Sequence, residues 1–125
     1  MYKAMKLKKL PYELSVCRLA DMQGIDLERE FFFLGRTDEE ISLVCRTEDV
    51  PDCTEAREDG WRAFRIEGVL DFSLTGILSG LSAVLAENKI GIFAVSTFNT
   101  DYILVKAGSF ERAAAVLAEA GYIIL

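Results

Sequence analysis

The order of apolar patterns in residues 61–125 constrains the fold more than any other feature of the sequence. Trp61 to Leu70 has the pattern of a β-strand, with Phe64 and Ile66 on one face. Leu74 to Asn88 follows with helical periodicity, and its apolar residues form one stripe: Leu74, Ile77, Leu78, Leu81, Val84 and Leu85. The two patterns together predict a strand followed by an amphipathic helix.

The pattern then changes back to strands. Gly91 to Phe98 is apolar on both faces, which suits a central strand, and Asp101 to Lys106 follows after a tight turn. Ser109 is a good N-cap for a second helix, which stops near Gly121. Tyr122 to Leu125 predicts a last short strand.

The predicted order is therefore strand, helix, strand, strand, helix, strand. Two right-handed βαβ units joined by a hairpin give a four-stranded antiparallel sheet with both helices on one face. This is the ferredoxin-like α+β fold. Because many activities share it, the fold alone says little about function.

The first half of the chain is rich in short strand patterns. We expect strands at residues 13–19, 30–36 and 40–46, a hairpin turn at 37–39, and one helical turn within 21–29. This composition allows a second, degenerate copy of the same fold in residues 6–60. The polar, acidic stretch Thr47 to Gly60 is expected to be a loop and marks the best boundary, which divides the chain into residues 1–60 and 61–125.

Composition excludes several classes of partner. The 125 residues carry 20 acidic and 14 basic side chains, a net charge of −6, and an acidic surface repels nucleic-acid phosphates. The apolar stretches are interrupted before they reach the length that spans a membrane. Residues 1–10 contain lysines but no apolar core of a signal peptide, so we expect a cytoplasmic protein.

The sequence has few of the residue types that enzymes most often use for catalysis and metal binding. The absence of histidine removes the commonest general base and metal ligand. Three cysteines without a CxxC spacing are too few for a structural zinc site, and we expect Cys17 and Cys45 to be buried thiols and Cys53 an exposed one. We therefore expect no catalysis, no metal and no cofactor, in a reducing compartment.

The turn between the first strand and the first helix of the second half suits a small ligand. Free backbone N–H groups at a helix N-terminus bind a carboxylate, and Asp71 could pair with an ammonium group. A free amino acid offers both groups. The alternative is purely structural: Asp71 or Ser73 caps the helix, and Ser96 to Asp101 is only a well-made hairpin.

Two stretches resemble a known family. Residues 67–78, EGVLDFSLTGIL, resemble the first strand, turn and helix start of ACT domains, and residues 92–105, IFAVSTFNTDYILV, resemble their second and third strands. The most similar subgroup contains small ACT proteins akin to the regulatory domains of aspartate kinases and to the arginine-sensing ACT proteins of animal cells. In that subgroup the first half is a truncated second ACT unit.

The resemblance implies where a ligand would bind. The first strand–helix loop and the end of the second strand form the ligand site of the family, commonly at a subunit or domain interface. Carried onto this sequence, the site comprises Asp71, Phe72, Ser73, Leu74, Thr75, Gly76 and Ile77 with Ser96, Thr97, Phe98, Asn99, Thr100 and Asp101.

The function implied is an allosteric, non-catalytic regulatory module that binds an amino acid or similar small metabolite. The alternative is a ligand-free dimerisation module that docks on a partner protein. The small residues Gly76, Gly80 and Ala83 and the open sheet edges also favour pairing. We expect a homodimer or two ACT-like halves paired within one chain, with an enzyme as a partner but neither nucleic acid nor membrane.

Overall fold

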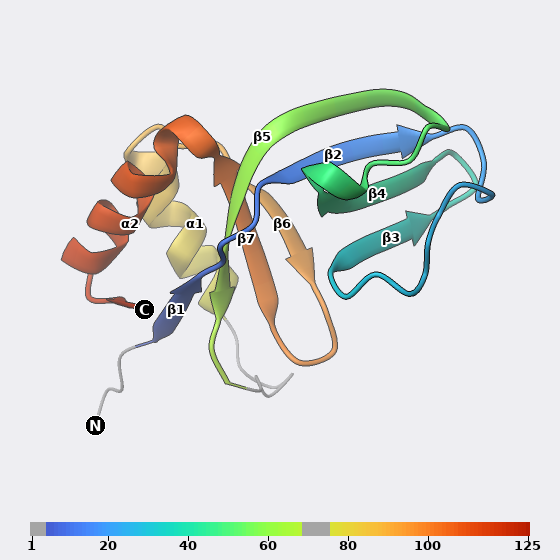
Figure 1. Cartoon of the computed structure of the whole chain (residues 1–125). Coiled ribbons are helices and arrows are strands. Elements are labelled where there is room, and N and C mark those ends of the chain that lie inside the picture. The colour runs from blue at the N-terminus through green and yellow to red at the C-terminus, as the bar shows by residue number, and fades with distance from the viewer. Residues whose placement is uncertain (1–4, 69–75) are drawn as a thin grey trace. The chain divides into compact units, whose positions relative to one another are not determined.

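The computed structural model describes residues 5–68 and 76–125, which form two compact units. One unit combines Met1–Pro11 with Arg62–Leu125, and the other is Tyr12–Trp61. Along the chain (Figure 1) the elements are β1 (Lys6–Lys9), β2 (Leu14–Leu19), β3 (Phe32–Arg36), β4 (Ile41–Arg46), the 3-10 turn η1 (Thr47–Asp49), β5 (Thr54–Ile66), α1 (Ile77–Glu87), β6 (Phe93–Ser96), β7 (Asp101–Lys106), the 3-10 turn η2 (Ala107–Ser109), α2 (Phe110–Glu119) and β8 (Ile123–Ile124). No helix among these residues is long and apolar enough to cross a membrane.

The unit Tyr12–Trp61 is a ferredoxin-like sheet without helices. Its strands lie in the order β3-β4-β2-β5, and every neighbouring pair is antiparallel. If these four strands are numbered 1 to 4 along the chain, their order in the sheet is 2-3-1-4, which is the strand order of a βαββαβ fold. The segment 20–31 and the turn η1 with its following loop stand where the helices would be. The β-rich, degenerate first half is therefore confirmed.

Two predictions for this unit are wrong. Residues 21–29 form turns instead of a helical turn, because Asp21 and Asp26 accept hydrogen bonds from the backbone N–H groups two residues on, at 2.9 and 3.0 Å. Thr54 to Gly60 is part of β5 and not a loop. Its side chains are polar because most of them are exposed, while its backbone pairs with β2.

The other unit contains both helices and one more strand than predicted. Its sheet has the order β6-β7-β5-β1-β8, in which β1 runs antiparallel to β5 and parallel to β8. The lysine-rich start of the chain thus inserts a strand between the first and last strands of the βαββαβ pattern. Within the described residues β6 pairs with β7, so it lies at an edge and the expected central position is wrong.

A single apolar core joins the helices to this sheet. Phe64 and Ile66 of β5 and Ile103 and Val105 of β7 lie two residues apart on one face, and they share a buried cluster with α1 and α2. Leu81 and Leu85 confirm the predicted stripe of the first helix. Both helices therefore cover the same face, as expected for the ferredoxin-like fold.

The helix starts differ from the prediction in detail. α1 begins at Ile77, and Gly76 occupies the N-cap position with a φ of 77°, which favours glycine. Ser109 does lie at the N-cap of α2, but its side chain makes no capping hydrogen bond. The 3-10 turn η2 leads directly into α2 instead.

Phe110 is the side chain whose truncation should cost this unit most. It is 1% exposed and stacks on Phe64 with ring centroids 4.5 Å apart, and the Arg62 guanidinium carbon lies 4.3 Å from its ring centroid. Phe110→Ala should lower the free energy of unfolding, measured by urea denaturation, by about 3–5 kcal/mol. Leu27→Ala, at a residue that is 66% exposed, should change it by less than about 0.5 kcal/mol. Similar losses in both variants would contradict the assigned core.

Candidate functional site

One part of the predicted ligand site is the hairpin between β6 and β7. Ser96 pairs with Asp101 at the ends of the two strands. The Thr97 N–H and its hydroxyl both donate to the Thr100 carbonyl, each at 2.8 Å. The turn is thus held by hydrogen bonds of its own, as the structural alternative requires, while the ring of Phe98 is 80% exposed.

Thr100 connects this hairpin to the end of β5. It is 6% exposed, and its Oγ1 donates a hydrogen bond of 2.6 Å to the carbonyl of Ile66, the last residue of that strand. Residues 67–77 follow directly from Ile66. The hydrogen bond therefore holds the hairpin at the end of β5.

The structure describes only the end of that other half. Asp71, Phe72, Ser73, Leu74 and Thr75 lie outside the described residues. Gly76 and Ile77 form the start of α1, where the first helical hydrogen bond runs from the Gly80 N–H to the Gly76 carbonyl. The N–H groups that precede Gly80 in the helix have no acceptor within it, because the first turn of any α-helix leaves them unused.

The unit Tyr12–Trp61 contains a cavity of about 520 Å³ that sequence analysis did not predict. Its apolar wall includes Phe32, Leu43 and Val50, which pack with the buried Cys17 and Cys45. The cavity lies where the unit has loops in place of helices. The only sequence signal for it is the lack of an amphipathic helix between the first two strands.

Gly24 brings the two loops around the cavity together. A Cβ at Gly24 would lie 3.0 Å from the Cys53 Sγ and 3.3 Å from the Pro51 Cβ, closer than ordinary contacts. The Cys53 thiol also lies 3.8 Å from the Asp21 carbonyl oxygen. Cys53 is therefore half-buried in this contact and not the exposed thiol that we expected.

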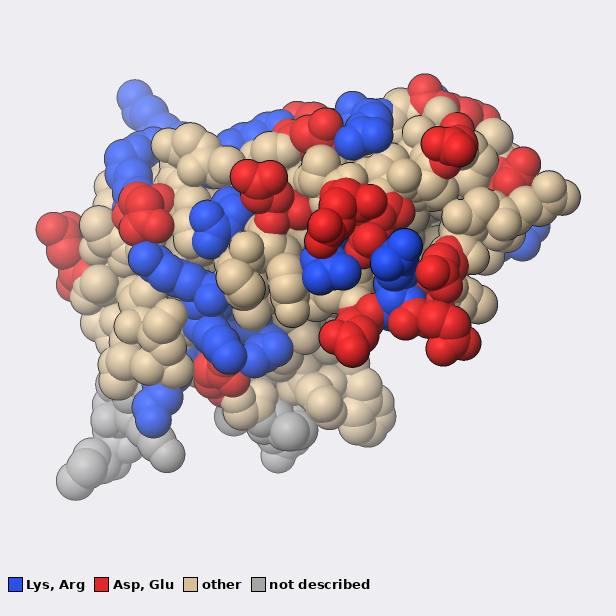
Figure 2. All heavy atoms as spheres, in the orientation of Figure 1, with Lys and Arg blue, Asp and Glu red and all other residues tan. Residues whose placement is uncertain are grey.

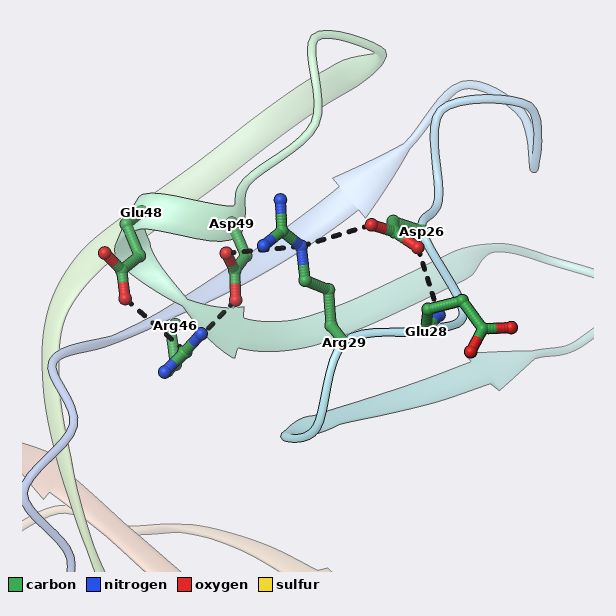
Figure 3. A network of polar contacts seen from close by, with 6 residues as sticks. All are labelled: Asp26, Glu28, Arg29, Arg46, Glu48 and Asp49. Carbon is green, nitrogen blue, oxygen red and sulfur yellow. Dashed lines mark hydrogen bonds and ion pairs between the residues drawn. The ribbon is translucent and has the colours of Figure 1, made fainter.

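Charged side chains line the rest of the cavity. Asp49, whose side chain is 5% exposed, lies 3.1 Å from the Arg46 Nε and 3.6 Å from the Arg29 Nε. Asp26 lies 3.3 Å from the same Arg29 nitrogen (Figure 3). Figure 2 shows acidic side chains gathered around basic ones on one face of the molecule. No group of three or more His, Cys, Asp or Glu side chains in residues 5–68 and 76–125 is arranged to hold a metal ion.

The two other thiols are buried, as predicted. Cys17 is 3% and Cys45 2% exposed. Burial, with a smaller contribution from the neighbouring Cys17, raises the pKa of the Cys45 thiol to about 12. Burial also raises the pKa of Cys17. Both groups therefore stay protonated near neutral pH and are poor nucleophiles.

Comparison with known proteins identifies the family. The family model described as ACT domain matches residues 56–119, and the chain belongs to the ACT domain family. A crystal structure of an Agobacterium tumefaciens protein is 35% identical, covers 99% of this chain and 94% of its own, and superposes with a TM-score of 0.85. A search of curated protein sequences finds no match.

Aspartate kinases share the fold at low identity. The regulatory subunit of aspartate kinase from Thermus thermophilus, in a ligand-free form, is 10% identical over 94% of this chain and 99% of its own, with a TM-score of 0.64. Aspartate kinase from Clostridium acetobutylicum is 15% identical over 94% of this chain and 34% of its own, with the same TM-score of 0.64. The resemblance to ACT domains related to those of aspartate kinases is confirmed.

The Thr100 hydroxyl should matter more to stability than its neighbour. Thr100→Val keeps the shape but removes the donor to the Ile66 carbonyl, which should lower the free energy of unfolding by about 1–3 kcal/mol. Thr97→Val, at an exposed position of the same turn, should cost less than about 1 kcal/mol. Urea denaturation measures both, and equal losses would show that the bond to β5 does not hold the hairpin.

The three thiols should differ in reactivity. At pH 8 a disulfide reagent such as DTNB should react with Cys53 in the folded protein and reach Cys17 and Cys45 only after unfolding in urea, because those two are buried and protonated. Cys53→Ser should abolish the reaction of the folded protein. A rapid reaction that survives this substitution would contradict the burial of the other two.

Proposed function

We propose that this chain is a regulatory module that binds an α-amino acid or a similar small metabolite and performs no catalysis. The observation that carries the proposal is the hydrogen bond from Thr100 to Ile66, which holds the Ser96–Asp101 hairpin at the end of β5. The family and the fold shared with the Thermus thermophilus aspartate kinase regulatory subunit support it.

The proposed site divides the charged groups of the ligand between two partners. The ligand carboxylate accepts hydrogen bonds from backbone N–H groups near Ser73 to Ile77, where the helix dipole favours negative charge. The ammonium group is held by Asp71 or by carbonyls of β6. The contacts come from the segments Asp71, Phe72, Ser73, Leu74, Thr75, Gly76 and Ile77, and Ser96, Thr97, Phe98, Asn99, Thr100 and Asp101.

The proposal also states how the two halves of the chain, or two copies of it, form the site together. The proposed ACT domain is residues 61–125, whose sheet β1 also joins, and residues 1–60 contain its degenerate companion. The ligand side chain points toward that half or toward a second copy in a homodimer. An allosteric effect would act on a partner enzyme in the cytoplasm. The second candidate is a ligand-free module that docks on a protein, and the 80% exposed ring of Phe98 favours it, because exposed aromatic side chains often anchor interfaces.

Asp71→Ala tests the proposed ammonium contact. Loss of one charge-assisted contact costs about 1.5–3 kcal/mol, so the affinity for an amino acid should fall roughly tenfold to a hundredfold. A thermal-shift screen of the twenty amino acids selects the ligand, because binding to the native state raises the melting temperature. Calorimetric titration then compares the two proteins.

Asp38→Ala is the matched control, since Asp38 is an exposed acid of the hairpin turn in the other unit. It should bind as tightly as the unmodified protein. Equal affinity in Asp71→Ala would overturn the ammonium assignment. If no amino acid binds the unmodified protein at millimolar concentration, the ligand-free docking module replaces the proposal.

A further inference from the structure

The cavity in the unit Tyr12–Trp61 has the make-up of a ligand site that is separate from the hairpin. All residues that line it lie between Asp21 and Cys53, so it belongs to this unit alone. Its volume of about 520 Å³ falls within the usual range for small-molecule sites. Its lining combines apolar side chains, including Phe32 and Leu43, with charged ones, including Arg29 and Asp49.

Arg29 is the one basic residue that lines the cavity, and its donors are only partly used. Both of its ion pairs, to Asp26 and Asp49, are made through Nε, at 3.3 and 3.6 Å, which is longer than a normal N–H···O hydrogen bond. Its side chain is 51% exposed. The two terminal nitrogens of a guanidinium form a planar pair that matches the two oxygens of a carboxylate.

The cavity is lined by more carboxylates than guanidinium groups. Five acidic side chains line the cavity: Asp21, Asp26, Glu48, Asp49 and Asp52. Arg46 lies beside Glu48 and Asp49 and balances part of their charge. A simple anion would be repelled by this excess, and a simple cation would leave the Arg29 donors unused. A molecule that carries both charges satisfies both sets of groups.

We propose that this cavity is a second ligand site, which binds a small α-amino acid with an apolar side chain. The ligand carboxylate pairs with the terminal nitrogens of Arg29. The ammonium group lies among the carboxylates of the rim, including Asp21 and Asp52, and the side chain contacts Phe32 and Leu43. This site goes beyond the proposed function, because none of its residues belongs to the hairpin or to the turn before α1.

L-leucine and two analogues test the charge requirement. 3-Methylbutylamine lacks the carboxylate and 4-methylpentanoate lacks the ammonium group, while both keep the branched side chain. Because Cys53 lines the cavity, its reaction with DTNB reports on this site and not on the hairpin. Leucine should slow that reaction in a saturable way, and each analogue should need at least about a tenfold higher concentration, since each lacks one charge-assisted contact.

Variants separate the two sites. Arg29→Gln should raise the leucine concentration that protects Cys53 by roughly tenfold to a hundredfold. Arg18→Gln is the matched control, because Arg18 also pairs through Nε with an acid, is 55% exposed and does not line this cavity. It should leave protection unchanged, as should Asp71→Ala, whose effect belongs to the hairpin site.

Three results would overturn the second site. A Cys53 reaction that leucine leaves unchanged would exclude an apolar amino acid here. Protection by the amine alone at the same concentration as leucine would indicate a plain cation site. Protection lost equally in Arg18→Gln and Arg29→Gln would show that Arg29 holds no carboxylate. None of these results decides whether the hairpin binds a ligand, because Asp71→Ala tests that separately.

Discussion

The strand β5 is the element on which both units depend. It is 13 residues long, and it contributes Thr54–Trp61 to one unit and Arg62–Ile66 to the other. Its first part pairs with β2, and its second part pairs antiparallel with β1. Gly60, with a φ of 82°, lies in the stretch where the register with β2 shifts between Leu14 and Val16. A side chain with a Cβ would be strained at that φ, so glycine suits the bulge.

The two units differ in what covers their sheets. As a result, one unit has an apolar core beneath its helices and the other has a cavity with charged side chains. Where α1 and α2 cover one face, Phe64, Ile66 and Phe110 form a dense apolar core. Where loops replace the helices, Leu43 and Cys45 meet a cavity that charged side chains surround. Burying charges costs free energy unless they are paired, which explains why the nearly buried Asp49 lies beside two arginines.

Most of the fold could be predicted from local patterns. The alternation of Ile41, Leu43 and Cys45 and the stripe that contains Leu81 and Leu85 report the faces that become buried. The insertion of β1 could not be predicted, because strand order depends on pairing between residues far apart in the sequence. The polar start of β5 was missed since its side chains are exposed and only its backbone is paired.

The candidate sites were predictable to different degrees. The hairpin was predicted from the apolar patterns on both sides of a tight turn, and its role as a site from the resemblance to ACT domains, although the bond from Thr100 to Ile66 needs three-dimensional geometry. The cavity was not predicted because its charged lining comes from loops whose polar residues resemble an ordinary surface. Gly24 and Cys53 carry no motif, and only their close approach shows that the two loops meet.

The central claim is the proposal that an amino acid binds to the Ser96–Asp101 hairpin and to the backbone at the start of α1. The most direct measurement is a backbone amide NMR titration of the full chain with the amino acid that raises its melting temperature most. The account predicts saturable chemical-shift changes at Gly76, Ile77 and Ser96–Asp101. Saturable binding with no change at any of these amides would contradict it.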